Sequence, residues 1–118
     1  MRLRLPISLA ALVALLVAPA AEALTTFYGR VGPGTTIVLR RANGTVVRRT
    51  APGYRTFVIR DRSAAHNFHL YGPGIDKRTG VAFVGKRTWS PLRLRVGRST
   101  IVCDVHPATM IRTFTVAR

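Results

Sequence analysis

Cysteine, acidic residues and histidine are all scarce in this sequence. The 118 residues include one cysteine, four acidic residues, three histidines and two methionines. A single cysteine excludes any disulfide within the chain, although small exported domains often depend on such bonds. So few carboxylates leave almost nothing for catalysis by paired acidic groups, and no nucleophile stands beside a suitable base. We therefore predict that the chain is not an enzyme and has no small-molecule substrate.

Basic residues, by contrast, are abundant. Lysine and arginine together number 19, and the formal net charge is +15. Nucleic acid is the partner that such a charge first suggests. The basic residues are, however, spread over many segments, and no nucleic-acid-binding motif accompanies them. We therefore predict no nucleic-acid partner, and expect the positive surface to steer acidic proteins or anionic envelope polymers toward the chain.

The first 23 residues have the pattern of a secretory signal. Two arginines within the first four residues precede an almost entirely apolar run over residues 5–18, and small residues follow at positions 21 and 23. We predict cleavage after Ala23, with Ala20 as the alternative, and one mature domain over 24–118. The apolar run is shorter than the roughly 20 residues of a spanning helix, so an uncleaved anchor is the less favoured alternative. We therefore expect an exported protein, periplasmic or extracellular, with an envelope-associated form as a further alternative.

The mature chain reads as an all-β domain of about seven to eight short strands. Runs rich in Val, Ile, Thr, Phe and Tyr alternate with Gly, Pro and Asn, and no amphipathic helix is convincing. Asn43-Gly44 predicts a hairpin that returns into a strand over 45–49. Further strands are predicted over 54–60, 65–71 and 81–84, with a loop over 72–80. Pro91 lies within the predicted strand 87–94 and implies an edge position or a bulge. The spacing is typical of a β-sandwich or a small Greek-key barrel.

Nearly all of the soft metal-binding side chains lie in one segment. Cys103, His106 and Met110 fall within eight residues, in a predicted loop between two strands. A further donor is available upstream, at His66 or His69. Two histidines, one cysteine thiolate and a weak axial methionine form a trigonal copper site for electron transfer. Zinc is the competing metal, because one cysteine and two histidines form a valid partial zinc set; a thioether ligand such as Met110 argues against it.

The segment from Tyr54 to Arg118 resembles the copper-binding part of the plastocyanin/azurin family of cupredoxins. The matching residues are His66-Asn67 and, 37 positions after His66, Cys103-x-x-His106-x-x-x-Met110. The resemblance implies a cupredoxin-like Greek-key β-sandwich or barrel that holds one copper per chain. It further implies that His66, Cys103 and His106 are the strong ligands and Met110 the axial one. It assigns Asn67 to hydrogen bonds that tie the two ligand loops together. The implied role is that of a one-electron carrier. From the positive charge, and not from the resemblance, we expect transient docking with acidic redox partner proteins, and we expect the chain to be a monomer.

Three alternatives stay open at this point. His69 is the alternative to His66 as a ligand; because alternate residues of a strand face opposite sides, only one of the two aims at the Cys103 loop. His66 shares its face with Phe68 and Leu70, so His69 is expected to point outward or to support the ligands. The other two alternatives are functional: a copper carrier or sequestering protein without electron-transfer turnover, and a metal-free binding module of the same fold.

Overall fold

The computed structural model describes residues 2–8, 10–14 and 23–118. The regular structure begins at Thr26, inside the predicted domain of residues 24–118. Most of the segment that decides the predicted cleavage, including Ala20, lies outside the described residues. Within the part of the chain that the structure describes, no helix is long and apolar enough to cross a membrane.

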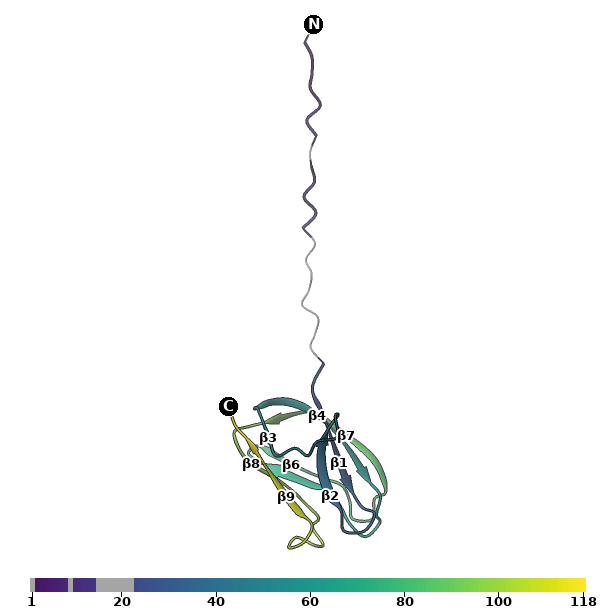
Figure 1. The fold of residues 1–118 in the computed structure, drawn as a ribbon. Coiled ribbons are helices and arrows are strands. Elements are labelled where there is room, and N and C mark those ends of the chain that lie inside the picture. Colours follow the sequence, from purple (N-terminus) through teal and green to yellow (C-terminus); the bar gives the residue numbers. More distant parts are fainter. Residues whose placement is uncertain (1, 9, 15–22) are drawn as a thin grey trace.

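Within the described residues, nine strands form two mixed sheets (Figure 1). The first sheet has the order β2-β1-β4-β7 and the second the order β3-β9-β8-β5-β6. Most neighbouring strands are antiparallel, but β1 runs parallel to β4 and β3 runs parallel to β9. The strands are β1 (Thr26–Val31), β2 (Ile37–Arg41), β3 (Arg49–Thr50), β4 (Gly53–Asp61), β5 (His69–Gly72), β6 (Ile75–Arg78), β7 (Gly85–Leu94), β8 (Gly97–Val102) and β9 (Ile111–Val116). The all-β prediction is confirmed, and the two separate sheets exclude the closed-barrel alternative.

The core lies between the two sheets and follows from the alternation of side chains along the strands. Phe27 of β1 and Phe57 of β4 are buried and meet edge to face, with ring centroids 5.7 Å apart. Ile101 of β8 and Phe114 of β9 belong to the same buried cluster from the opposite sheet. Apolar residues on one face of every strand except β3 therefore build a single core shared by both sheets.

The Asn43-Gly44 turn forms, but the predicted strand after it does not. The N–H of Arg41 donates to the carbonyl of Thr45 at 2.8 Å, and Gly44 has a φ of +87°, which favours glycine. Beyond this turn only an isolated bridge between Arg40 and Val46 pairs with β2. The chain then crosses to the other sheet, where β3 pairs with β9. The prediction of a strand over 45–49 was therefore wrong.

Two other strand predictions and one loop prediction differ from the structure. The predicted strand over 65–71 begins only at His69, so His66 lies in a loop. The predicted loop over 72–80 contains β6, which pairs with β5 alone at the edge of its sheet and so tolerates charged residues. Residues 81 and 82 form a turn and residues 83 and 84 lie in no regular element, so the predicted strand over 81–84 was wrong. The prediction for Pro91 is confirmed, because β7 is an edge strand and its register with β4 shifts between Arg55 and Phe57, opposite this proline.

Candidate metal centre

Cys103 directly follows β8 and begins the loop that leads through Met110 into β9. Hydrogen bonds close this loop at its base: the N–H of Cys103 donates to the carbonyl of Met110, and the N–H of Met110 donates to the carbonyl of His106, both at 2.9 Å. The N–H of His106 donates to the carbonyl of Cys103 at 3.1 Å. These bonds satisfy the backbone within the loop and hold its three donor-bearing residues in one short turn.

The loop between β4 and β5 brings His66 to the same place. The Sγ atom of Cys103 lies 3.7 Å from Nδ1 of His66 and 4.0 Å from Nδ1 of His106. One ligand atom from each of the three side chains lies within 4.8 Å of the other two. Cys103 is fully buried and His66 is only 8% exposed, whereas His106 is exposed. These three residues form a group that can hold a metal ion.

The spacing of the three donors fits one shared ion. Bonds of about 2.0–2.1 Å to an imidazole nitrogen and about 2.3 Å to a thiolate sulfur are usual for zinc, which is close in size to copper. Two such bonds 120° apart place nitrogen and sulfur about 3.8 Å from each other by simple geometry. The distances of 3.7 and 4.0 Å from the Cys103 sulfur to the two ring nitrogens are close to this value. The two sulfur–nitrogen distances are therefore compatible with one shared ion.

Met110 lies at the far end of the loop, where its side chain is fully buried. It belongs to the same apolar cluster as Cys103 and Phe114. Burial keeps the thioether away from water, and the backbone bonds of the loop hold Met110 beside both Cys103 and His106. Its part as a weak fourth ligand stays a prediction.

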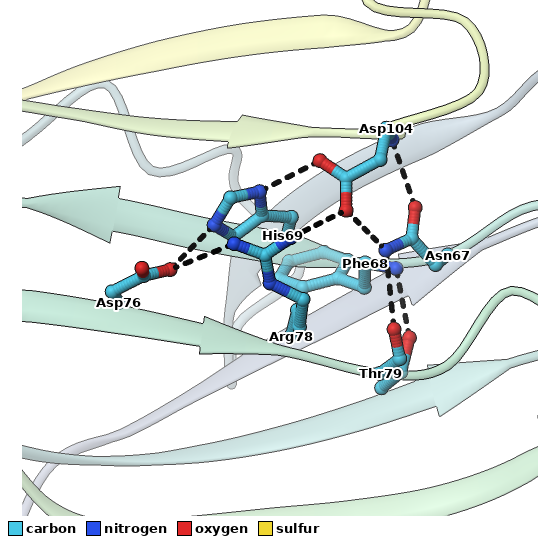
Figure 2. Close-up of polar contacts among 7 residues, drawn as sticks. All are labelled: Asn67, Phe68, His69, Asp76, Arg78, Thr79 and Asp104. Atoms are coloured by element: carbon cyan, nitrogen blue, oxygen red, sulfur yellow. Dashed lines mark hydrogen bonds and ion pairs between the residues drawn. The ribbon is translucent and has the colours of Figure 1, made fainter.

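Asn67 joins the two ligand-bearing segments (Figure 2). Its Oδ1 accepts the backbone N–H of Asp104 at 2.8 Å, and its Nδ2 donates to Oδ2 of Asp104 at 2.7 Å. The same Nδ2 donates to the carbonyl of Thr79 at 3.1 Å. Since Asn67 follows His66 and Asp104 follows Cys103, these bonds fix the two segments one residue away from two of the donors.

His69 lies outside the group of three and is held by carboxylates on both sides, as Figure 2 shows. Its Nδ1 is 2.8 Å from Oδ1 of Asp104, and its Nε2 is 2.6 Å from Oδ1 of Asp76. Arg78 lies 3.5 Å from Asp104 and 3.6 Å from Asp76. His69 thus connects the Cys103 loop to β6. The argument that His66, and not His69, faces the Cys103 loop assumed a strand over 65–71. The strand begins only at His69, although Phe68 and Leu70 are buried, as that argument required.

The two carboxyl groups beside His69 both have lowered pKa values. The hydrogen bond from His69 is the main cause for Asp76, and the charges of His69 and Arg78 add to it. Burial by itself would raise the pKa of Asp104, but hydrogen bonds from Asn67 and His69 outweigh that effect. Both carboxylates are therefore favoured in their ionised form, in which they accept hydrogen bonds most strongly.

Sequence reasoning missed a second set of hydrogen bonds, made by Asp61 and Thr79, near the segment that carries His66. Asp61 is buried; its carboxylate accepts the N–H of Ser63 at 3.0 Å and the hydroxyl of Thr79 at 3.3 Å. Burial raises the pKa of Asp61. The Thr79 hydroxyl also accepts the N–H of Phe68 at 2.9 Å. Since the predicted mature chain has only three acidic residues, their rarity could have indicated that Asp61 has a structural role.

The comparisons with known proteins add no relatives to this description. No protein-family model matches the chain, and no curated protein matches it either. What the chain does must therefore be inferred from its own donor set, in which one buried thiol and two imidazoles meet within 4.8 Å.

Proposed function

We propose that this chain is a mononuclear type 1 copper protein that carries single electrons. The observation that supports this most is the convergence of Cys103, His66 and His106 within 4.8 Å at the end of a β-sandwich. Two imidazoles and one thiolate, with a thioether nearby in the chain, are the donor set of blue-copper sites. Bound copper would supply a one-electron couple, and the remaining features concern how the chain's own residues hold and screen it.

The choice of copper over zinc depends on the soft donors. Cys103 and Met110 both carry sulfur, and both are fully buried. Soft thiolate and thioether ligands select Cu(I), whereas imidazole also suits Cu(II). Zinc sites draw on cysteine, histidine and carboxylate instead. The one carboxylate in the loop, that of Asp104, is bonded to Asn67 and His69.

Exposure of the donors suggests where electrons leave. His66 and Cys103 are buried, but His106 is exposed, together with Val105, Pro107 and Ala108 on the same loop. We infer that His106 is the exit and that its neighbours form a small apolar contact surface. Contacts between redox proteins are small and short-lived, which a patch of this kind suits. In this proposal the fold is the Greek-key cupredoxin arrangement, and the protein is exported and acts as a monomer.

A copper titration tests the proposal. Purified protein mixed with Cu(II) should develop an intense visible thiolate-to-copper absorption that saturates at one copper per chain. Cys103→Ser should abolish the colour, while His69→Gln, which changes a histidine outside the donor group, should keep it. Colourless protein at saturating copper contradicts the proposal. Stopped-flow reduction of the coloured protein then separates an electron carrier from a copper-sequestering protein, because only the former exchanges electrons rapidly.

A further inference from the structure

Three basic side chains stand in a row across the outer face of the four-stranded sheet. Arg30 of β1 is in register with Arg60 of β4, and Arg60 is in register with Lys86 of β7. All three side chains are exposed. Arg62, which is also exposed, follows at the end of β4. Four positive charges therefore gather over three neighbouring strands.

This arrangement carries an electrostatic cost that no ion pair among the described residues offsets. Like charges directly opposite each other on a sheet destabilise it, because their Cβ atoms are only about 5 Å apart. Within residues 23–118, the ion pairs join His69 or Arg78 to Asp76 or Asp104, so none of the row's cations has an acidic partner. An anion from another molecule would relieve the repulsion.

The row borders a pocket of about 670 Å³. Its lining consists of Arg30, Arg60, Asp61, Arg62, Val84, Gly85 and Lys86. The one acidic residue among them, Asp61, is 1% exposed and already bonded to Ser63 and Thr79. The surface that a partner meets is therefore basic, with exposed Val84 as its apolar part.

The pocket lies at the same end of the sandwich as the metal donors. Figure 1 shows the ends of β1 and β4 and the loop after β8 on one side, away from the C-terminus. Only three residues separate Arg62 from His66 in the chain. Behind the pocket, Asp61 is bonded to Thr79, whose carbonyl accepts Nδ2 of Asn67. A molecule seated on the pocket is thus close to the segment that carries His66.

We propose that this pocket is the docking surface for a cluster of carboxylates on an acidic redox partner protein. The inference rests on the proposed electron-transfer function and names a charged surface that this function would use in addition to the apolar contact surface around His106. Guanidinium groups pair with carboxylates through two parallel hydrogen bonds. Neighbouring strands are about 4.8 Å apart, so the row from Arg30 to Lys86 spans about 10 Å. Several carboxylates spread over a protein surface cover this width better than one small oxyanion does.

Binding of a polyglutamate peptide, followed by NMR amide shifts, tests the proposal. The largest shifts should fall at the ends of β1 and β4 and the start of β7. A variant that combines Arg30→Gln, Arg60→Gln and Lys86→Gln should bind the peptide about tenfold more weakly, because three partly desolvated ion pairs are lost. Its circular dichroism and unfolding midpoint show whether the fold is kept.

The matched control removes three charges from the opposite end of the sandwich. It combines Arg93→Gln, Arg98→Gln and Arg118→Gln, three exposed positions at or beyond the far ends of β7, β8 and β9. Its net charge equals that of the first variant, so net charge cannot explain a difference between the two. It should bind the peptide within about twofold of the parent protein, because none of its three substituted residues lines the pocket. Equal weakening of both variants overturns the proposal, since net charge alone then explains binding.

Two other probes decide the chemistry of the partner. If inorganic phosphate binds the parent protein as tightly as the peptide binds it, the proposal is overturned in favour of a small-oxyanion pocket. If vesicles of phosphatidylglycerol bind the parent protein and the peptide fails to bind, the proposal is overturned in favour of a membrane surface. Copper uptake is read separately by visible absorption: if the parent and both variants stay colourless with Cu(II), the electron-transfer function fails, while the peptide titration still decides the surface.

Discussion

Asn67 and Asp104 pair through two hydrogen bonds, one in each direction. The N–H of Asp104 donates to Oδ1 of Asn67 at 2.8 Å, and Nδ2 of Asn67 donates to Oδ2 of Asp104 at 2.7 Å. Because each residue directly follows a proposed ligand, the pair sets the distance between His66 and Cys103 before any metal arrives. Such preorganisation reduces the ordering cost of metal binding.

Asn67→Ala should destabilise the metal-free protein. The substitution leaves the partly buried N–H of Asp104 and the buried carbonyl of Thr79 without their partners, at a cost of about 2–3 kcal/mol. Urea unfolding of the metal-free protein measures the change. Thr88→Ala, at an exposed position of β7, serves as control and should shift stability by less than about 0.5 kcal/mol. Equal stability of the Asn67 variant and the parent would show that other contacts hold the segments of His66 and Cys103 together.

Asp76 should titrate below the ordinary aspartate value of 3.8, because His69 hydrogen-bonds its ionised form. A carboxyl group with a lowered folded-state pKa adds stability above pH 3.8, and this stability is lost as the pH falls through the lowered pKa. NMR titration of the Asp76 carboxyl carbon measures the pKa directly. In His69→Gln the pKa of Asp76 should return toward 3.8. An unshifted pKa in the parent protein would contradict the contact between Asp76 and His69.

Gly29→Ala should destabilise the fold through Phe68. A Cβ at position 29 would lie 2.5 Å from Cδ1 of Ile59 and 2.7 Å from Cζ of Phe68, so the core must shift. Overpacking of this kind costs about 1–3 kcal/mol, which thermal or urea unfolding measures. Gly80→Ala is the matched control, because the nearest atom to its Cβ is 3.8 Å away. Gly29→Ala should therefore be less stable than Gly80→Ala. If the two variants have the same stability, the ring of Phe68 is not packed against β1.

Met110→Leu should keep the blue absorption but raise the reduction potential of the copper-loaded protein. Leucine preserves the buried volume and removes the weak donor, so Cu(II) loses more stabilisation than Cu(I), since the axial ligand tunes the potential of such sites. Voltammetry measures the potential. Stability of the metal-free protein should change by less than about 1.5 kcal/mol, because the swap conserves volume. An unchanged potential would remove Met110 from the proposed ligands.

Much of the fold could be predicted, because alternation and turn residues are local signals. Phe57 and Ile59 alternate with exposed or half-buried neighbours, and β4 formed within one residue of its predicted ends. The strand expected over 65–71 failed for a non-local reason. The side chain of Thr79 accepts the N–H of Phe68, and Asn67 bonds to Asp104, so side chains replace the ladder bonds that a strand needs. Nothing in the sequence near Phe68 indicates this.

The candidate site, like the fold, could be predicted from the sequence only in part. The closeness of Cys103 and His106 was visible in their three-residue spacing, and the soft-donor content of the loop pointed to a metal. The bridge from Asp104 through His69 to Asp76 was not visible. Its members lie 35 and seven residues apart in the chain, and only the pairing of β5 with β6 and β8 brings them together.

X-ray absorption at the copper edge of the Cu(II)-loaded protein tests the central claim most directly, because it counts the atoms bound to the metal. The convergence of Cys103 with His66 and His106 predicts one short bond to sulfur and two bonds to imidazole nitrogens, with loss of the sulfur in Cys103→Ser. A spectrum that shows copper bound only by nitrogen and oxygen, unchanged by Cys103→Ser, would contradict the account.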